Sequence, residues 1–418
     1  MTEPTRATFL VETPIALDEA LDKLVSEMTL GSFIEVPGEA ELRGRFRGAI
    51  ESIEELPPSD HPSLMGPYAP DTPVQRARVV IRIPGDLIAD DLFTLLASVL
   101  GNGCELKEIS GLRLLDVEFP PSLTDACPNP QFGVAGTRRL TGVDGRPIIG
   151  SIIKPSVGLT PEQTAVMVQE LTEAGIDFIK DDELMTSPDY SPLPKRVEAV
   201  MRVINRHADK TGKKVMFAFN ISHDQIDTML RHHDAVLEAG GTCIMLSIHH
   251  VGYAGVMKVR QHSQLPIHGH RNGWGLYTRA PWLGMDFRPY QKFWRLAGID
   301  QLHVNSIRNK FWEPDDSVVR SIQALLTPDH QGERALPVLS SGQWGGQAPD
   351  TYCLTHTVDL MYLAGGGIQG HPDGPAAGVR AIQLAWEAAM QGIPLETYAA
   401  AHPELARQIE RFGKREKA

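Results

Sequence analysis

From about residue 145 onward, the sequence alternates short apolar runs with amphipathic stretches, and no other feature constrains the fold as strongly. The apolar runs are PIIGSIIK, IDFIKDD, KVMFAFNIS, CIMLSIHHV, LPIHGH, IDQLHVNS, LPVLSSG and MYLAGGG. A helical pattern lies between most of them. Strands that are apolar on both faces are typical of parallel sheets covered by helices. Eight such strand-then-helix units predict a (β/α)8 TIM barrel of the α/β class.

The first of these helices has clear end signals. Thr160 can cap it, Pro161 suits its first position, and Gln163 completes a capping box. Apolar residues then recur until Gly175, which ends the pattern. A second helical stretch, DQIDTMLRHHDAVLEAGG, ends at a glycine pair.

The first 140 or so residues do not repeat this unit. They contain a helical segment, LDEALDKLVSEM, and two alternating runs, RARVVIRIP and LRLLDVEFP, which predict an antiparallel sheet with helices. We expect the stretch ELPPSDHPSLMGPYAPDTP to be a loop and FPPSLTDACPNPQFG to be a linker. The predicted domains are an N-terminal α+β domain, residues 1–140, and a barrel with the active site, residues 141–418.

Composition excludes several functional classes. The formal net charge of −12 argues against nucleic-acid binding, which requires a basic surface. No signal peptide and no membrane-spanning run is evident, so we expect a cytoplasmic protein with small molecules or other proteins as partners. Four dispersed cysteines, without CxxC spacing, are expected to be small buried side chains in a reducing compartment.

Ionisable and glycine residues collect at the same end of successive predicted strands, where TIM barrels place their active sites. They are Lys154, Lys180, Asp182, Glu183, His270, Arg271, His303, Ser340, Ser341, Gly342, Gly365, Gly366 and Gly367. Charges scattered over a surface would not follow strand ends in this way.

The stretch DFIKDDE has two interpretations. Its charges are either solvated after the chain leaves the core or they form a metal site. Lys180 and Asp182 are two residues apart, so both side chains point to one side of a strand, and Glu183 can reach in from the loop. Oxygen ligands of this kind suit Mg²⁺. Lys180 fits such a site only as a salt-bridge partner or as an anionic carbamate.

Each neighbouring motif also has a structural alternative. The three glycines after the last run form either a plain turn or a backbone cradle for phosphate. Arg271 is either part of a structural ion pair or a bidentate grip on phosphate or carboxylate. The HGH spacing before Arg271 allows a transition-metal site. Lys154 is either a snorkelling lysine or a catalytic base.

In this order, these residues resemble the RuBisCO large subunit over most of the chain. The motifs that carry the resemblance are SIIKPSVGLT, GIDFIKDDE, HGHR, IDQLHVNS, LSSG and LAGGGIQGHPDG. The resemblance implies an N-terminal ferredoxin-like α+β domain before the barrel. It also implies a homodimer, or an oligomer built from dimers, whose sites combine both subunits.

The resemblance further implies a role for individual residues. Lys180 would be the carbamylated lysine, with Asp182 and Glu183 completing the Mg²⁺ ligands. Lys154 would move a proton at the enolisable carbon, and His270 would lie beside the reacting carbons. Anion or phosphate contacts would come from Arg271, His303, Ser341 and Gly342 on one side and from Gly365 and Gly366 on the other. Glu27 in EMTLGSF and Asn102 in VLGNG would come from the neighbouring subunit.

Three departures argue against a carboxylase of ribulose bisphosphate. Ser156 stands where the carboxylating enzymes carry a second lysine. Asn272, Gly273 and Trp274 replace the residues expected after the HxHR motif. The segment after the sixth strand, NSIRNKFWE, is bulky and basic, although Lys310 lies at the right distance to be that loop's catalytic lysine. The sequence therefore indicates a RuBisCO-like protein of type IV.

We expect a Mg²⁺-dependent lyase acting on a small phosphorylated substrate through an enediolate. The favoured reaction is decarboxylation or hydrolytic C–C cleavage of a β-keto sugar-acid phosphate, such as 3-oxoisoapionate 4-phosphate, because Lys310 and Arg271 can hold a substrate carboxylate. One alternative is an enolase or isomerase for methylthio-sugar phosphates in methionine salvage, with Trp274, Trp312 and Trp344 building an apolar pocket. Another is a non-catalytic scaffold. Without the family resemblance, the residues alone would indicate a Mg²⁺-dependent barrel aldolase or isomerase acting on a phosphorylated substrate.

Overall fold

A computed structural model describes residues 3–31, 37–327 and 334–413 of the 418-residue chain. The chain forms two compact units. The first contains Met1–Pro128 and Gly273–Leu296, and the second contains Asn129–Asn272 and Ala297–Ala418. The predicted division after residue 140 differs from these units in two ways: the first unit ends at Pro128, and it also includes Gly273–Leu296. The sequence gives no local signal for the inserted segment, because it joins the first unit through a strand pairing with residues far away in the chain.

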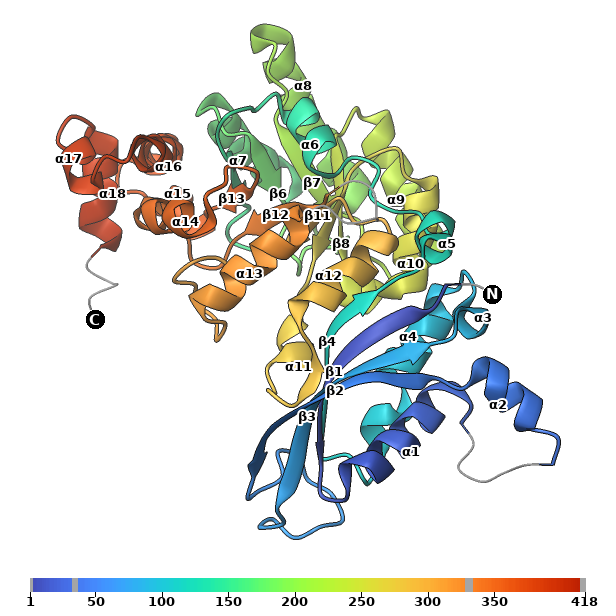
Figure 1. The fold of residues 1–418 in the computed structure, drawn as a ribbon. Coiled ribbons are helices and arrows are strands. Elements are labelled where there is room, and N and C mark those ends of the chain that lie inside the picture. The colour runs from blue at the N-terminus through green and yellow to red at the C-terminus, as the bar shows by residue number, and fades with distance from the viewer. Residues whose placement is uncertain (1–2, 32–36, 328–333, 414–418) are drawn as a thin grey trace. The chain divides into compact units, whose positions relative to one another are not determined.

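The first unit is an α+β domain built on one five-stranded sheet in the order β10-β4-β1-β3-β2 (Figure 1). Strands β1 to β4 are antiparallel, and β10 adds to β4 in parallel. Without β10, the order 4-1-3-2 and the alternation of strands with α1 and α4 give the ferredoxin-like arrangement. The elements are β1 (Thr5–Thr13), α1 (Leu17–Thr29), α2 (Ala40–Phe46), β2 (Ala49–Ser59), β3 (Val74–Ile83), α3 (Gly85–Ile88), α4 (Leu92–Leu100), η1 (Asn102–Glu105), β4 (Gly111–Glu118), α5 (Pro121–Ala126), α11 (Trp274–Thr278), β10 (Leu283–Met285) and α12 (Phe287–Leu296).

The alternating runs and the helix predicted for this unit are confirmed. On β1, Ala7, Phe9 and Val11 are buried, and α1 buries Leu21 and Leu24 among its apolar residues. One detail of the prediction was wrong. Strand β2 continues through the prolines to Ser59, so the proline-rich stretch is a loop only beyond that residue. Proline is tolerated there because β2 lies at the edge of the sheet. The boundary between the two units lies inside the predicted linker, after Pro128, and that linker also contains the short helix α5.

The second unit is a closed barrel of eight parallel strands, as predicted (Figure 1). The strands are β5 (Ile148–Ile152), β6 (Phe178–Lys180), β7 (Met216–Asn220), β8 (Cys243–Ser247), β9 (Ile267–His270), β11 (Gln301–His303), β12 (Leu336–Leu339) and β13 (Met361–Leu363). The helices are α6 (Gly133–Thr141), α7 (Pro161–Glu173), α8 (Leu193–Thr211), α9 (Ile226–Glu238), α10 (Ile248–His262), α13 (Asp315–Leu326), η2 (Gly345–Gln347), α14 (Ala348–Thr355), α15 (Gly365–Gln369), α16 (Gly374–Gln391), α17 (Leu395–Ala399) and α18 (Pro403–Phe412).

The predicted helix signals are present at α7, where Thr160 and Gln163 form the capping box. In the fourth apolar run, however, the residues from Ile248 onward begin α10 and do not extend the strand. The cysteine prediction holds for Cys127 and Cys243 only, because Cys104 and Cys353 are exposed. Within the described ranges, no helix is both long and apolar enough to cross a membrane.

The barrel interior is apolar toward the N-terminal ends of its strands. Buried residues of one cluster include Ile148, Phe178, Met216, Leu336 and Met361, each from a different strand. This packed core closes the barrel at that end. The predicted site residues Lys180, His270 and His303 lie at the other, C-terminal ends of their strands, which is where active sites of this fold lie.

Asp300, the residue before β11, fixes the start of that strand through its side-chain hydrogen bonds. Its Oδ1 accepts hydrogen bonds from the backbone N–H groups of Gln131, Phe132 and Gly133, at 2.6 to 3.1 Å. Its Oδ2 accepts from Ile267 N and from Arg260 Nη1, both at 2.8 Å. The side chains of Asp300 and Arg260 are both fully buried. One carboxylate thus ties β9, α10 and the start of α6 to β11.

We expect Asp300→Asn to lower the free energy of unfolding of the barrel by about 3–5 kcal/mol, because the amide cannot accept at both positions and leaves Arg260 as a buried unpaired charge. Urea unfolding followed by circular dichroism measures this. Asp224, whose side chain is 86% exposed, supplies the control; Asp224→Asn should change the same quantity by less than about 0.5 kcal/mol. Equal stability of the two variants would contradict this role of Asp300.

Candidate active site

The C-terminal end of the barrel brings together predicted residues from four strands. Lys180 ends β6, with Asp182 and Glu183 in the turn that follows, and His270 ends β9. Lys154 lies two residues beyond the end of β5 and His303 ends β11. Direct contacts join several of them: Lys154 Nζ is 2.9 Å from Asp182 Oδ2, and His270 Nε2 is 3.3 Å from Glu183 Oε2.

Lys180 is buried inside the barrel, with 1% of its side chain exposed. Its Nζ donates to the backbone oxygen of Asp181 at 2.7 Å, and the nearest carboxylate oxygen, on Glu183, is 3.9 Å away. Burial lowers the pKa of Lys180, while the charges of Glu183 and Asp182 act in the opposite direction. Loss of water around the ammonium therefore favours the neutral amine, which is the form that reacts with CO₂.

Asp182 is held as a carboxylate by its neighbours. Burial acts to raise its pKa, but hydrogen bonds from Lys154 and Ser156 outweigh burial and lower it. Lys154 Nζ is also 2.5 Å from Ser156 Oγ. Ser156, the residue that replaces the second lysine of carboxylating enzymes, thus orders both the candidate base and a candidate metal ligand.

The run of three acids in DFIKDDE divides between two environments. Asp181 points away from Lys180, and its Oδ2 accepts from Arg196 Nη2 at 3.1 Å and from Asn220 N at 3.0 Å. The side chains of Asp181 and Arg196 are both buried. Asp181 is therefore a structural ion-pair residue. Asp182 lies on the side of Lys180, as the alternation of side chains predicts. Glu183 reaches the same side from the turn after β6, with its Oε2 3.9 Å from Lys180 Nζ.

Three histidines line the β9 and β11 side of the site. Thr137 Oγ1 donates to Gly133 O at 2.7 Å, so it accepts from Gln301 Nε2, which lies 3.1 Å away, and Gln301 Oε1 faces His268 Nδ1 at 2.9 Å. His268 Nδ1 must then carry the hydrogen, which leaves its Nε2 to accept from His303 Nε2 at 2.8 Å.

His303 Nδ1 is consequently an acceptor, and it faces the Ser340 hydroxyl at 3.2 Å. Burial lowers the pKa of both His268 and His303 well below the usual value. Both ring nitrogens of His268 are committed to this chain of hydrogen bonds. A transition-metal site at HGH is therefore not supported, and sequence reasoning had not identified Gln301 as the residue that sets the tautomers.

Arg271 points into an ion pair with Glu313, a residue that the sequence had not singled out. Arg271 Nη2 and Glu313 Oε2 are 3.0 Å apart, with 5% and 2% of the two side chains exposed. Ser341 has a positive φ of 83°, unusual for a serine, and its hydroxyl donates to Asn305 Oδ1 at 3.3 Å. Lys310 donates its backbone N–H to Ser341 O at 3.2 Å, and its side chain begins beside Gly342.

The glycines after β13 begin α15. A Cβ atom at Gly365 would lie 3.6 Å from Lys154 Cε, a Cβ at Gly366 would meet nothing within 4 Å, and a Cβ at Gly367 would collide with Gln343 O. Gln369 anchors this turn to β5 by donating to Ile152 O at 2.5 Å. Gly365 and Gly366 thus leave open backbone next to Lys154.

Two predicted residues belong to the first unit. Glu27 lies near the end of α1 and is partly buried, and Asn102 begins η1 and is exposed. Part of the EMTLGSF motif, residues 32 and 33, lies outside the described residues. The participation of Glu27 and Asn102 in a shared site stays a prediction.

A second group of metal-ligand residue types, His233, Asp234 and His262, lies between α9 and the end of α10. Asp234 Oδ1 contacts both histidines, at 2.9 and 2.6 Å. His233 Nε2, however, accepts from the backbone N–H of Gln264 at 3.3 Å. A neutral histidine that binds metal through Nδ1 carries a hydrogen on Nε2 and donates it, so this environment has the wrong polarity for a metal ligand.

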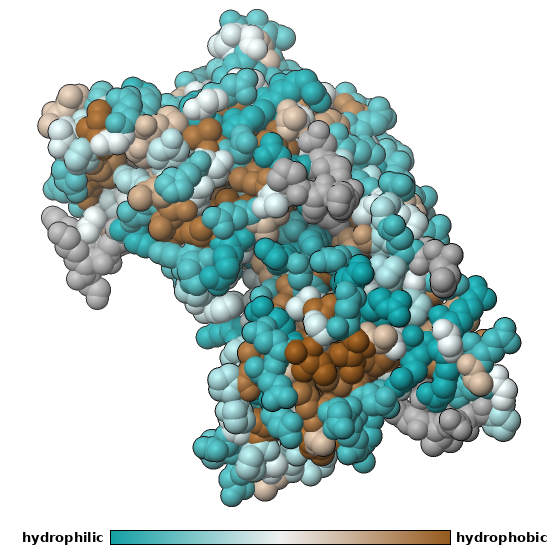
Figure 2. Space-filling model, in the orientation of Figure 1, coloured by the Kyte–Doolittle hydropathy of each residue, from teal (hydrophilic) through white to brown (hydrophobic). Residues whose placement is uncertain are grey.

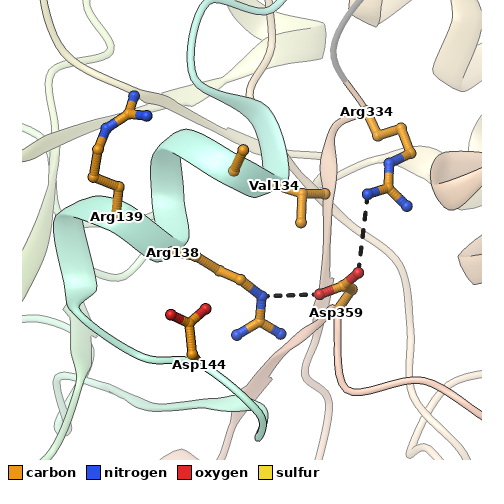
Figure 3. A pocket seen from close by; sticks show the side chains of 7 residues that line it. Val134, Arg138, Arg139, Asp144, Arg334 and Asp359 are labelled. Atoms are coloured by element: carbon orange, nitrogen blue, oxygen red, sulfur yellow. Dashed lines mark hydrogen bonds and ion pairs between the residues drawn. The ribbon is translucent and has the colours of Figure 1, made fainter.

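A hollow of about 500 Å³ lies at the opposite, N-terminal end of the strands (Figure 3). Arg138, Arg139 and Arg334 line it together with Asp144 and Asp359. Arg138 is held by Asp359 at 2.8 Å and by three backbone carbonyls. Residues at this end of a TIM barrel stabilise the fold, and the candidate active site lies at the other end.

Comparison with known proteins identifies the family of this chain. The family described as ribulose bisphosphate carboxylase large chain, catalytic domain, matches residues 133–412. The chain belongs to the RuBisCO large-chain family. A 3-oxo-isoapionate-4-phosphate decarboxylase from Rhizobium etli is 51% identical over 97% of this chain and 98% of its own length. A 3-oxo-isoapionate-4-phosphate transcarboxylase/hydrolase from Xanthobacter autotrophicus is 48% identical, again over 97% and 98%.

Among solved structures, a rubisco-like protein from Burkholderia fungorum superposes on this family member with a TM-score of 0.92 and 41% identity, covering 98% of this chain and all of the other. The predicted family and fold are therefore confirmed. The likeness extends through both units, since the aligned share leaves neither of them out.

We expect His270 to stay neutral between about pH 5 and 8, in contrast to an ordinary histidine. Burial, and then the charge of Lys180, lower its pKa to about 3, so it would protonate only in strong acid. Nitrogen-15 NMR of histidine-labelled protein measures this, with His270→Asn used to assign the signal. A His270 signal that titrates within that pH range would contradict this expectation.

Proposed function

We propose that this protein is a Mg²⁺-dependent lyase that decarboxylates 3-oxoisoapionate 4-phosphate. The observation that carries the proposal is the full-length likeness to two enzymes whose names contain that substrate, at 51% and 48% identity. The two names describe different outcomes for the carboxylate, decarboxylation in one case and transfer or hydrolysis in the other. We favour simple decarboxylation because the more similar of these two relatives performs it.

The residues at the mouth of the barrel suit a magnesium ion. Asp182 and Glu183 offer carboxylate oxygens, and a carbamate on Lys180 would supply a third anionic ligand of the oxygen type that Mg²⁺ prefers. Lys180 is suited to that modification because it is buried and no carboxylate lies within hydrogen-bonding distance of its Nζ. When bound, Mg²⁺ would act as a Lewis acid that stabilises negative charge developing on the substrate's keto oxygen.

The surrounding residues have distinct tasks in the proposed reaction. The bond between the carboxylate carbon and its neighbour breaks, CO₂ leaves, and the electron pair forms an enediolate that must then take up a proton. Lys154, held by Asp182 and Ser156, is the proposed proton donor to that carbon. The open backbone at Gly365 and Gly366 would hold the phosphate. His270, neutral and beside Glu183, would orient the substrate's hydroxyl groups.

Carboxylation of ribulose bisphosphate is disfavoured by the segment after β11. Arg308 Nη2 donates to Gly346 O at 2.6 Å, Lys310 N donates to Ser341 O, and Asn309 Nδ2 donates to Glu313 O at 2.9 Å. These bonds fasten the segment, whereas a carboxylating enzyme uses a mobile loop here. Ser156 also removes one of the cations of a carboxylase site.

The contacts of the tryptophans argue against the methylthio-sugar alternative. Trp344 packs against Phe412, Trp274 packs against Phe287 and Tyr290 in the first unit, and the side chain of Trp312 is exposed. Contacts among the described residues thus show separate packing environments for the three. The scaffold alternative is weakened because the candidate metal ligands and the candidate base are present and in contact.

We also propose a cytoplasmic homodimer, or an oligomer built from dimers, in which the partner contributes Glu27 and Asn102. Figure 2 shows apolar side chains gathered on one face of the first unit. The exposed apolar residues of that unit include Ile50, Ile53, Leu276 and Tyr277. Contiguous exposed apolar patches are typical of surfaces at which proteins associate.

Proton NMR with 3-oxoisoapionate 4-phosphate, Mg²⁺ and bicarbonate tests the activity. We expect loss of the substrate with release of CO₂, a rate at least about 100-fold lower for Lys154→Met, and no reaction for Lys180→Ala. Appearance of two acids would indicate hydrolytic cleavage instead. Unchanged substrate would refute the sugar-acid reaction, and deuterium uptake from D₂O by a methylthio-sugar phosphate would then support the isomerase alternative.

A further inference from the structure

We propose that Glu313 determines specificity by neutralising Arg271, so that the site accepts one phosphate and disfavours a second dianionic group at the Arg271 end. The inference rests on the proposed function in one respect, namely that the substrate lies across the mouth of the barrel. It explains, from this chain's own residues, why a monophosphate would be preferred to a bisphosphate.

Glu313 is a buried centre of hydrogen bonds. Its Oε2 faces Arg271 Nη2 at 3.0 Å and accepts from Asn305 Nδ2 at 2.5 Å, while its Oε1 accepts from Ser317 Oγ at 2.9 Å. The residue is 4% exposed. Asn305 in turn accepts from the Ser341 hydroxyl. The carboxylate therefore connects the ends of β9, β11 and β12 with the first turn of α13.

The buried charges at this end of the site cancel. Arg271 contributes one positive charge and Glu313 one negative charge, and both side chains are buried. His303 adds no cation, because its ring lies between His268 and the Ser340 hydroxyl, with each ring nitrogen in one hydrogen bond. Lys310 is exposed and its side chain begins near Gly342, so it adds one solvent-exposed positive charge at this end.

A phosphate at Arg271 would lie beside the buried carboxylate of Glu313. Like charges repel strongly where water is excluded, and displacing Glu313 would strand it without its partners. The segment that carries Glu313 is fastened at Arg308, Asn309 and Lys310, so it is not free to withdraw the carboxylate. A single carboxylate on the substrate could pair with Lys310 alone, whereas a phosphate dianion would remain half neutralised.

The other end of the site differs. Gly365 and Gly366 present open backbone beside the Lys154 side chain, and none of the described contacts places a carboxylate against Gly366. The two ends are therefore unequal in charge: the glycine end suits a phosphate, and the Arg271 end suits a neutral or singly charged group.

Calorimetric titration with ribitol 5-phosphate and ribitol 1,5-bisphosphate, in the presence of Mg²⁺ and bicarbonate, tests this asymmetry. For the unmodified protein, we expect the second phosphate to give no gain in affinity. In Glu313→Gln, which keeps the shape but removes the charge, Arg271 becomes available, and the bisphosphate should bind roughly tenfold or more tighter than the monophosphate.

Two variants serve as controls. Asp359→Asn removes the carboxylate partner of another arginine, Arg138, at the far end of the barrel, and it should leave the ratio of the two affinities unchanged. The double variant Glu313→Gln, Arg271→Gln should return the ratio to that of the unmodified protein. A Glu313→Gln ratio that does not change would overturn the proposal.

If Glu313→Gln does not fold, the unmodified protein still decides the question, because a tenfold or greater preference for the bisphosphate would also overturn the proposal. Binding of these unreactive polyol phosphates does not depend on turnover. A protein that binds the monophosphate selectively but leaves 3-oxoisoapionate 4-phosphate unchanged would refute the proposed reaction while supporting the role of Glu313.

Discussion

The candidate site depends on the burial of one lysine inside a closed barrel. Burial removes water from the Lys180 ammonium, which keeps one hydrogen bond, to the backbone oxygen of Asp181. The carboxylates of Glu183 and Asp182 are near enough to act on its charge but too far away to accept a hydrogen bond from it. A buried ammonium in this setting is costly, and the cost is relieved by loss of the proton or by conversion to an anion that a cation can balance. The proposed roles of Asp182, Glu183 and Lys154 all depend on the state of Lys180.

The barrel makes this burial possible. Apolar side chains fill its N-terminal end, and Asp300 fixes the register at which β9 and β11 enter. Inside the barrel, Gln301 at the start of β11 is linked through His268 to His303 at the end of that strand, and this chain of hydrogen bonds defines the tautomers of both histidines. Hydrogen bonds therefore hold the histidines on the β9 and β11 side of the site. Lys154, the candidate proton donor, follows β5 on the opposite side of the barrel.

Much of this could be predicted from the sequence. The alternation of apolar runs and capped helices indicates the barrel, and the parity of side chains along DFIKDDE separates Asp181 from Lys180 and Asp182. The pairing of β10 with β4 could not be predicted, because it joins residues far apart in the chain. Glu313 was missed for a similar reason: its importance comes from contacts with Arg271 and Asn305, which depend on the path of an irregular segment. The exposed cysteines were missed because composition alone says nothing about the position of each one.

Carbon-13 NMR of the protein in ¹³C-bicarbonate and Mg²⁺ tests most directly whether Lys180 becomes the anionic ligand on which the proposed site depends. The prediction is one protein-bound carbamate signal that persists after free bicarbonate is removed and that is absent from Lys180→Arg, which keeps a cation but cannot be carbamylated. Absence of the signal from the unmodified protein, or its persistence in Lys180→Arg, would contradict a carbamate-metal site at Lys180.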